Sequence, residues 1–257
     1  MLILVKLGGG LIAPKSWPAH TADIKTIKRL SKEIKEFKGN LIIGHGGGNF
    51  PHFEAAKYKT HLGFKDAVGR LGACLTQEAA RNINSIVVRE FLALGLPVAA
   101  VVPHDIWVTK SGRLTAEFYE PIKLLLAKGI RPVVYGDVIW DETAGSVIFS
   151  TERILGLLAR KLGGVKVIIQ ISSEEGVLDS GGKVIAEINH GNFNQLKQSI
   201  GGAEGVDVTG GMLHKVKESL SLAKDLGIET LIISGKIKER LAAVLRGETV
   251  LGTRIRN

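Results

Sequence analysis

The chain alternates short runs of β-branched and aliphatic residues with longer helical patterns, and this alternation restricts its fold more than any other feature. Near the N-terminus, the pattern predicts a strand over Leu2–Lys6, a helix over Thr21–Phe37 and a strand over Leu41–Gly44. Such a unit joins two parallel strands through a helix that packs on one face of their sheet. The sequence therefore predicts an α/β fold.

The alternation continues through most of the chain. Helices on both faces of a mostly parallel central sheet, a three-layer αβα arrangement, are the expected result. Further strands are predicted over Val98–Val102, Pro132–Tyr135, Lys166–Ile171 and Thr230–Ile233, and further helices over Arg70–Leu94, Ala116–Lys128, Glu152–Leu162, Met212–Leu226 and Ile237–Arg246.

A predicted β-hairpin interrupts this alternation near the middle of the chain. Its strands, Val138–Trp140 and Val147–Phe149, flank a turn-rich segment over residues 141–146. We place a lobe boundary here, which gives an N-terminal lobe of residues 1–150 and a C-terminal lobe of residues 151–257.

The composition is that of a folded protein in a reducing compartment. The chain has 257 residues, of which 45% are hydrophobic, so it can bury a sizeable core. Cys74 is the single cysteine, which excludes an intramolecular disulfide and favours the cytoplasm. The apolar N-terminal run reaches a charge at Lys6, too soon for a signal peptide, and the longest apolar stretch, Phe91–Val102, contains Gly95 and Pro97. We expect no membrane span.

The charge balance points to an anionic partner. The formal net charge is +9, from 34 basic and 25 acidic residues. The basic residues are spread through mixed-sign helices such as Lys25–Lys38, and no aromatic-interleaved basic run occurs. We therefore expect a small phosphorylated molecule as the partner, and no nucleic acid.

Three glycine-rich segments carry the functional signal. They are Lys6–Gly10 with Lys15 nearby, Gly44–His52, and Asp207–Met212 leading into a helix with Lys215. Parallel sheets bind ligands beyond the carboxyl ends of their strands, and glycines let several backbone N–H groups converge on one anion. A glycine run can also serve only a tight turn. Three such loops with adjacent lysines favour phosphate binding.

Other nucleotide-binding patterns do not fit. The chain contains no G-x-x-x-x-G-K-[ST] sequence and no strand-linked G-x-G-x-x-G fingerprint. The signature set of protein kinases is also absent. These absences argue against a P-loop NTPase, a dinucleotide-binding protein and a protein kinase.

Taken together, the motifs resemble the amino acid kinase family. They are Lys6–Gly9, Gly46–His52, Gly136–Val138, Asp207–Met212 with Lys215, and Gly252–Ile255, and they follow the family order along nearly the whole chain. Within that family, a histidine that closes the second glycine loop is similar to isopentenyl phosphate kinases. The resemblance implies transfer of phosphate from ATP to isopentenyl phosphate, a step of isoprenoid biosynthesis by an alternative mevalonate route.

The resemblance also implies roles for particular residues. The N-terminal lobe would bind the acceptor and the C-terminal lobe ATP, with Mg²⁺ on the ATP oxygens and no protein ligand assigned to the metal. A homodimer is implied by analogy. The catalytic residues would be Lys6, Lys15, His52 and Lys215; the ATP-binding residues Lys6, Gly8, Gly9, Gly10, Gly48, Ser173, Gly211 and Lys215; and the acceptor-binding residues Gly47, His52, Thr151 and Glu152.

Some residues depart from the family pattern. Ser172–Val177 stands where the family usually has Thr-Asp-Val-Asp-Gly-Val, and Thr151–Arg153 where it has Gly-Asp-Glu. Pro51 replaces a common glycine, which fixes φ and removes one N–H from the loop, and Gly10 replaces a common serine. His45 matches no family role, so we predict a structural hydrogen bond for it.

Two questions stay open at this stage. Apolar residues within Phe64–Leu75 and Val133–Ile139 are predicted to line the pocket for the acceptor's hydrocarbon tail. Other kinases of the same fold, of the fosfomycin, carbamate, glutamate or uridylate type, are alternatives. A nucleotide- or anion-binding protein without turnover is another.

Overall fold

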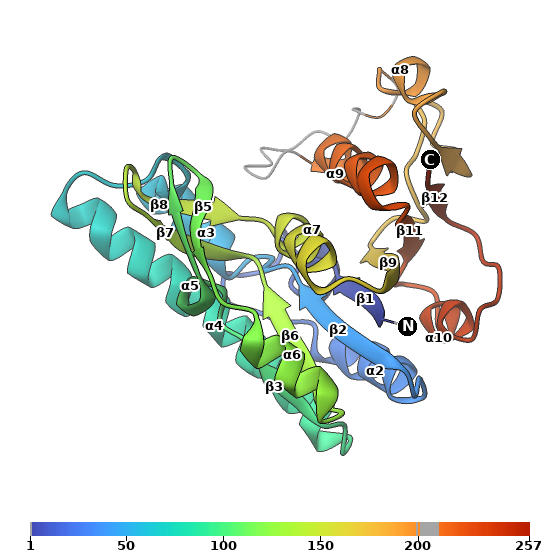
Figure 1. Ribbon diagram of the computed structural model, residues 1–257, viewed down its shortest axis with the longest axis horizontal. Coiled ribbons are helices and arrows are strands. Elements are labelled where there is room, and N and C mark those ends of the chain that lie inside the picture. Colours follow the sequence, from blue (N-terminus) through green and yellow to red (C-terminus); the bar gives the residue numbers. More distant parts are fainter. Residues whose placement is uncertain (1, 199, 201–210) are drawn as a thin grey trace.

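The computed structural model describes residues 2–198, 200 and 211–257, which form a mostly parallel eight-stranded sheet (Figure 1). Within this part of the chain, every neighbouring strand pair of the sheet runs parallel except β11 with β12. In spatial order the strands are β10 (Glu187–Ile188), β12 (Thr253–Ile255), β11 (Glu229–Ser234), β9 (Val165–Ser172), β1 (Leu2–Leu7), β2 (Asn40–His45), β6 (Arg131–Tyr135) and β3 (Val98–Ala100).

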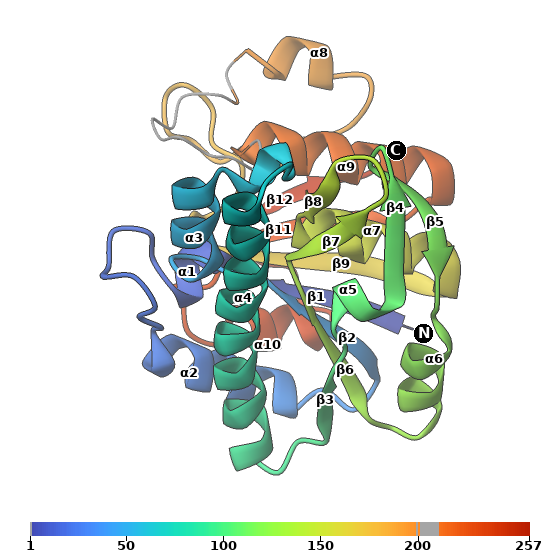
Figure 2. The ribbon, with the colours of Figure 1, turned by 90° about the vertical axis from the view of Figure 1, so that its left-hand side faces the viewer.

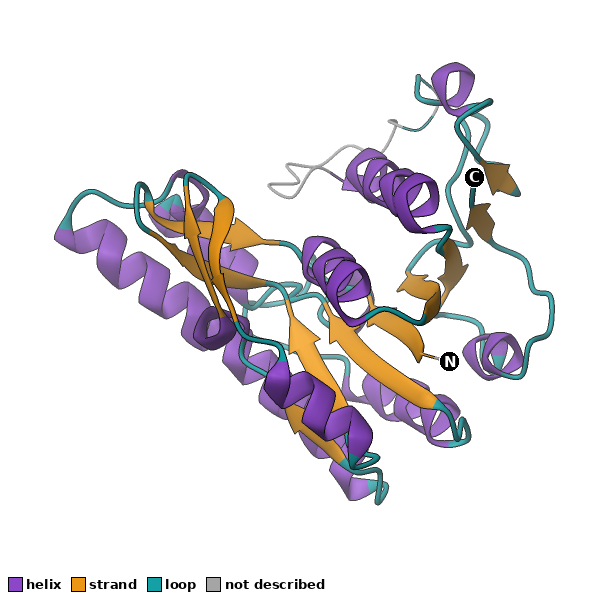
Figure 3. Ribbon diagram, viewed as in Figure 1, coloured by secondary structure: helices purple, strands orange, loops and turns teal. Residues whose placement is uncertain are grey.

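Helices cover both faces of this sheet, as Figure 3 shows in purple and orange. Alternate side chains of β1 explain why, because Ile3 and Val5 enter one hydrophobic cluster while Leu2 and Leu4 enter another. The first cluster includes side chains of α2 (Ile24–Lys35), α4 (Ala67–Ala93) and α10 (Arg240–Leu245), and the second those of α6 (Glu120–Ala127), α7 (Thr151–Leu162) and α9 (Gly211–Leu226). The predicted three-layer αβα fold is confirmed.

A smaller sheet lies beside α4 at one end of the molecule (Figure 2). Its strand order is β5 (Arg113–Glu117), β4 (Trp107–Lys110), β7 (Asp137–Asp141) and β8 (Gly145–Phe149). The hairpin predicted near the middle of the chain is β7–β8, in which Val138 pairs with Ile148.

Two predicted helices begin later in the structure than expected, and one hairpin was not predicted. The helix expected over Ala116–Lys128 begins only at Glu120, because the preceding residues belong to β5. The β4–β5 hairpin turns at Ser111 and Gly112, both with positive φ, and its short strands gave no clear alternation. The helix expected over Ile237–Arg246 begins at Arg240, after Glu239 adopts a left-handed conformation.

Short helices complete the chain, and the pairing of β1 with β2 brings two glycine loops together. They are α1 (Gly9–Ile12), α3 (Pro51–Tyr58), η1 (Thr60–Leu62), α5 (Pro103–Ile106) and α8 (Phe193–Leu196). Leu7 at the end of β1 pairs with His45 at the end of β2, so the loops that follow both strands leave the sheet at one edge. Among the described residues, none of the helices combines the length and apolarity needed to cross a bilayer.

The predicted lobe boundary at residue 150 falls between β8 and α7. The large sheet continues across it, because β1 of the first segment pairs with β2 on one side and with β9 of the second segment on the other. The division into an acceptor lobe and an ATP lobe therefore stays a prediction.

Candidate active site

Two glycine loops meet backbone to backbone above the ends of β1 and β2. A Cβ on Gly9 would lie 2.6 Å from the Gly48 nitrogen, and a Cβ on Gly46 would lie 2.6 Å from the Gly9 nitrogen. Gly48 also has a φ of +54°, which side chains rarely tolerate. The close approach therefore requires glycine, and it leaves the backbone of both loops facing the adjoining pocket.

This pocket has a volume of about 150 Å³ and is lined by both charged or polar and apolar residues. Its lining comes from the two glycine loops, the loop after α1, and helices α3, α4, α7 and α9 together with β7 and β8. Of the residues predicted from the sequence, it brings together Lys6, Gly9, Gly10, Lys15, Gly47, Gly48, His52, Thr151, Glu152 and Lys215.

At the floor of the pocket, Lys6 and Glu152 form a buried ion pair. The Lys6 Nζ lies 2.5 Å from the Glu152 Oε1, and both side chains are less than a tenth exposed. Burial alone would raise the pKa of Glu152, but the Lys6 and Lys215 ammonium groups outweigh it and hold this pKa below its usual range. Two lysines and one carboxylate leave a net positive charge at the floor, which suits a phosphate.

Thr151 and His45 support this floor. Ser150 caps α7 by accepting from the Arg153 N–H, and the Thr151 hydroxyl donates to the His45 carbonyl at 2.8 Å. The His45 ring is buried, with Nδ1 3.1 Å from the Gly46 carbonyl and Nε2 3.1 Å from the Asn84 Oδ1. Burial lowers its pKa. The structural hydrogen bond predicted for His45 is confirmed.

Three predicted ATP-binding residues lie outside the lining of the pocket. The Gly8 N–H continues the sheet by donating to Ile171, the Ser173 hydroxyl donates to the Glu174 carboxylate, and Gly211 begins α9 with a φ of +60°. Residues 207–210 of the third glycine loop lie outside the described residues. The ATP contacts of Gly8, Ser173 and Gly211 therefore stay predictions.

The apolar lining residues, which we call the apolar end, come from α3, α4 and the β7–β8 hairpin. Val138 lines it as expected, together with Ala55, Ala80, Ile148 and Phe149. The expected contribution of Phe64–Leu75 was wrong: α4 reaches the pocket only further along, at Thr76 and Ala80. Phe64 is used elsewhere, because its ring packs against Gly145 and its N–H donates to the Ala144 carbonyl.

Asp137 at the start of β7 is a pocket residue to which sequence reasoning gave no role. It is buried, and its Oδ2 lies 2.6 Å from the His104 Nδ1. Burial would lower the pKa of His104, but the Asp137 carboxylate outweighs this effect and raises it. The Gly136–Val138 motif was the available signal for Asp137, whereas nothing local marked His104 as its partner.

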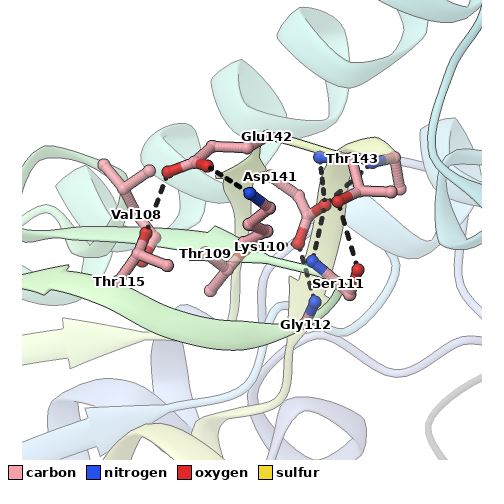
Figure 4. Close-up of polar contacts among 10 residues, drawn as sticks. Val108, Thr109, Lys110, Ser111, Gly112, Thr115, Asp141, Glu142 and Thr143 are labelled. Carbon is pink, nitrogen blue, oxygen red and sulfur yellow. Dashed lines mark hydrogen bonds and ion pairs between the residues drawn. The ribbon is translucent and has the colours of Figure 1, made fainter.

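A second carboxylate, Asp141, lies outside the pocket lining, at the end of β7, whose hairpin with β8 supplies Val138 and Ile148 to the pocket (Figure 4). It accepts hydrogen bonds from four backbone N–H groups, two in the β4–β5 turn and two in the β7–β8 turn, and from the Thr109 hydroxyl. Burial would raise the pKa of Asp141, but these donors outweigh it and lower this pKa well below the usual range. The two turns are thereby fixed to one another.

The described residues contain no group of three or more His, Cys, Asp or Glu side chains that could hold a metal ion. Cationic and backbone N–H groups dominate the polar end instead. Such an arrangement can bind and align phosphate groups.

Comparison with known sequences matches the chain to one family and to kinases. Residues 1–234 match the model of the amino acid kinase family. The chain is 31% identical to the isopentenyl phosphate kinase of Methanothermobacter thermautotrophicus, over 99% of this chain and 98% of the relative. It is 30% identical to that of Methanocaldococcus jannaschii, over 84% and 85% of the two chains, and 25% identical to the acetylglutamate kinase of Geobacillus thermodenitrificans, over 91% and 90%.

Solved structures agree with this assignment. An isopentenyl phosphate kinase structure aligns with a TM-score of 0.84 at 26% identity, covering 99% of this chain and 100% of the other. The product complex of the Thermoplasma acidophilum isopentenyl phosphate kinase aligns with a TM-score of 0.77 at 20% identity, over the whole of both chains, and supports the fold. This chain therefore belongs to the amino acid kinase family and is a kinase of the type that uses ATP.

Proposed function

We propose that this protein transfers the γ-phosphoryl group of ATP to isopentenyl phosphate, producing isopentenyl diphosphate and ADP. The observation that carries the proposal is that one pocket combines the lysines Lys6, Lys15 and Lys215, here called the cationic end, with apolar residues of α3, α4 and the β7–β8 hairpin, here called the apolar end. A molecule with a phosphate head and a short hydrocarbon tail matches both sets of residues. The full-length similarity to isopentenyl phosphate kinases supports the same assignment.

At the cationic end, the lysines act on the transferring group. Phosphoryl transfer passes through a loose transition state, so catalysis depends on alignment and on neutralising the charge of the equatorial oxygens. Lys6, Lys15 and Lys215 supply that charge, and the glycine loops supply N–H donors for the ATP phosphates. Gly47 and His52 bind the phosphate of the acceptor.

The chemistry needs no general base. An oxygen of the acceptor phosphate attacks the γ-phosphorus, the bond to the β–γ bridging oxygen breaks, and its electron pair leaves with ADP. A phosphate monoester has a second pKa of about 6, so the acceptor is already a dianion at neutral pH. His52 therefore acts as a hydrogen-bond donor. Mg²⁺ would be carried on the ATP oxygens, where it supplies further neutralising charge.

The apolar end argues against an amino-acid acceptor. Acetylglutamate would bring a second carboxylate and an amide to this end, and both need polar partners. Ala55, Ala80 and Ile148 offer none, and the buried Asp137 carboxylate is already paired with His104. A short prenyl chain gains about 0.8 kcal/mol for each methylene that it buries here.

An assay of ADP release over a panel of acceptors tests the proposal. The panel contains isopentenyl phosphate, methyl phosphate, N-acetylglutamate, glutamate, carbamate, fosfomycin and UMP, and phosphorus NMR identifies the product. Isopentenyl phosphate should give the highest kcat/KM, with a diphosphate as its product. A Lys6→Ala variant, purified in parallel, controls for contaminating kinases.

Other outcomes would contradict the proposal in different ways. Comparable kcat/KM for methyl phosphate and isopentenyl phosphate would show that the apolar end does not hold the acceptor. Preferred turnover of N-acetylglutamate or of another acceptor of the panel would assign the protein to that reaction. ATP binding without turnover of any acceptor would favour a non-catalytic binding protein.

A further inference from the structure

The segment that carries Lys15 is a surface loop with little packing of its own. It runs from Pro14 to Thr21, between α1 and α2, and residues 15–20 are exposed. Lys15 nevertheless lines the pocket. An exposed loop loses considerable backbone entropy when it is ordered, about 1–2 kcal/mol per residue, so another part of the molecule must hold it in place.

Asn49 in the second glycine loop contacts both ends of this segment. Its Nδ2 donates to the Pro14 carbonyl at 2.8 Å and to the Thr21 carbonyl at 2.9 Å. Its Oδ1 accepts from the Thr21 N–H at 3.2 Å, and its own N–H donates to the Ala13 carbonyl at 3.0 Å. The side chain is buried, so water does not compete strongly for these hydrogen bonds.

The contacts require an amide at position 49. Two carbonyl groups face one end of the side chain and an N–H faces the other, so only one orientation of the amide satisfies all three. A carboxylate of the same shape could accept from Thr21 but would place an oxygen against the Pro14 and Thr21 carbonyls. Aspartate is therefore an isosteric substitution that should release the segment.

A second contact holds the outer part of the segment to the same region. His20, whose φ is +59°, lies with its Nε2 3.4 Å from the Glu54 Oε1 and its ring edge-on to Phe50. Asn49, Phe50 and Glu54 flank His52 in sequence. The segment with Lys15 and the start of α3 with His52 are thus joined into one unit.

We propose that Asn49 is a positioning residue for Lys15, which it holds at the pocket by fixing both ends of residues 14–21. The inference rests on the transition-state role proposed above for Lys15. A displacement of about 1 Å in a group that acts on the transition state can lower a rate by about 10². Asn49 therefore affects catalysis by fixing the position of the Lys15 ammonium group, and it does not contact the substrate itself.

A double-mutant cycle in the full-length protein tests this role. Asn49→Ala and Asn49→Asp should each lower kcat by about tenfold or more, with the KM for ATP within about threefold of the wild type. In a Lys15→Ala background, Asn49→Ala should have almost no further effect, because the group that it positions is gone. Equal effects of Asn49→Ala in both backgrounds would overturn the proposal.

Asn192→Ala provides the matched control. Asn192 also spans a turn through its side chain, donating to the Glu187 carbonyl and accepting from the Asn189 N–H, but it lies outside the pocket lining. Its loss should leave kcat within about twofold of the wild type, because this half-buried side chain lies outside the pocket lining. If Asn192→Ala lowered kcat as much as Asn49→Ala, kcat would respond to any loss of loop structure in the protein. That result would overturn the positioning role of Asn49.

Hydrogen exchange tests the contact independently of any kinase activity. The backbone amides between Lys15 and Thr21, among them those of Trp17 and Thr21, should exchange at least tenfold faster in Asn49→Asp, and trypsin should cleave after Lys15 more rapidly, with other segments unchanged. Unchanged exchange in this segment would overturn the proposed contact, even if activity fell. If no acceptor were turned over, the proposed function would fail while the exchange result still decided whether Asn49 holds the segment.

Discussion

Two buried carboxylates, Glu152 at the floor of the pocket and Asp141 in the hairpin that forms its wall, are kept charged by different kinds of group. Glu152 is kept charged by the ammonium groups of Lys6 and Lys215, whereas Asp141 is surrounded by neutral donors from two turns. Ammonium groups can be shared with an incoming phosphate, but hydrogen bonds within fixed turns cannot. The floor is therefore suited to respond to ligands, and the wall to keep its shape.

The largest effect is expected from removing a cation at the floor. Lys6→Ala should lower kcat by about 10² or more, the scale of losing a preorganised charge in a site sheltered from water. Lys166→Ala, which removes an exposed lysine from β9, is the matched control and should leave kcat unchanged. If Lys6→Ala changed only the KM for ATP, the floor would bind the nucleotide without acting on the transition state.

Substitutions of His52 test whether the polar lining also binds the acceptor phosphate through a hydrogen bond from an uncharged donor. His52→Ala should cost about 1.5–3 kcal/mol in kcat/KM for isopentenyl phosphate, the worth of a hydrogen bond to a charged group. His52→Gln keeps a donor but cannot exchange a proton near neutral pH, so it should retain substantial activity. The measurement is kcat/KM for both variants from pH 6 to 9. Equal, near-complete inactivation of both would favour a general base and reopen the alcohol and carboxylate kinase alternatives.

In the wall, the expected effect is on stability and not on chemistry. Asp141→Asn replaces one acceptor oxygen by an NH₂ group that faces N–H donors, so buried donors lose their partner at a cost of about 1–3 kcal/mol in the free energy of unfolding. Urea denaturation measures this loss, and the kcat of the folded variant should stay within about threefold of the wild type. If Asp141→Asn lowered kcat without lowering the free energy of unfolding, the wall would act on catalysis as the floor does, and the distinction between them would be wrong.

The smallest expected effect is the pH dependence, in acid, of the difference in the free energy of unfolding between the wild type and Asp141→Asn. Because the pKa of Asp141 is lower in the folded state than in the unfolded state, its stabilisation is complete above the unfolded value, about 3.9, and is lost as the pH falls through the folded value. The stability difference between wild type and Asp141→Asn should therefore be constant from pH 7 to 5 and shrink below pH 4. A difference that grew on acidification would contradict the lowered pKa.

The elements that sequence predicted well are those with strong local patterns. The strands β1 and β2 and the β7–β8 hairpin have continuous apolar runs and clear turn residues, and each appears within a few residues of its predicted range. The β4–β5 hairpin and β12 were missed because their short strands mix polar and apolar residues and are defined by their pairing, which local sequence does not encode.

The site divides in the same way. Lys6, Lys15 and His52 were predicted because each lies in or beside a glycine loop, where the local sequence carries the signal. The contacts that hold these residues were not predicted. Lys6 and Glu152, for example, are 146 residues apart, and only the assembled fold brings them together. Asn49 was visible in its motif, but its contacts with Pro14 and Thr21 depend on how the loop folds back.

The place of β1 in the sheet has a consequence for how the chain folds. β1 precedes β9 in the chain, and one of its edges stays unpaired until β9 has been made, because Leu2 pairs with Val165. Loop closure over such a distance is slow, so we expect refolding to be limited by this pairing and not by the local β1–α2–β2 unit. A nascent chain that ends before β9 would leave a long apolar strand edge open, and during synthesis that edge is the point most exposed to aggregation.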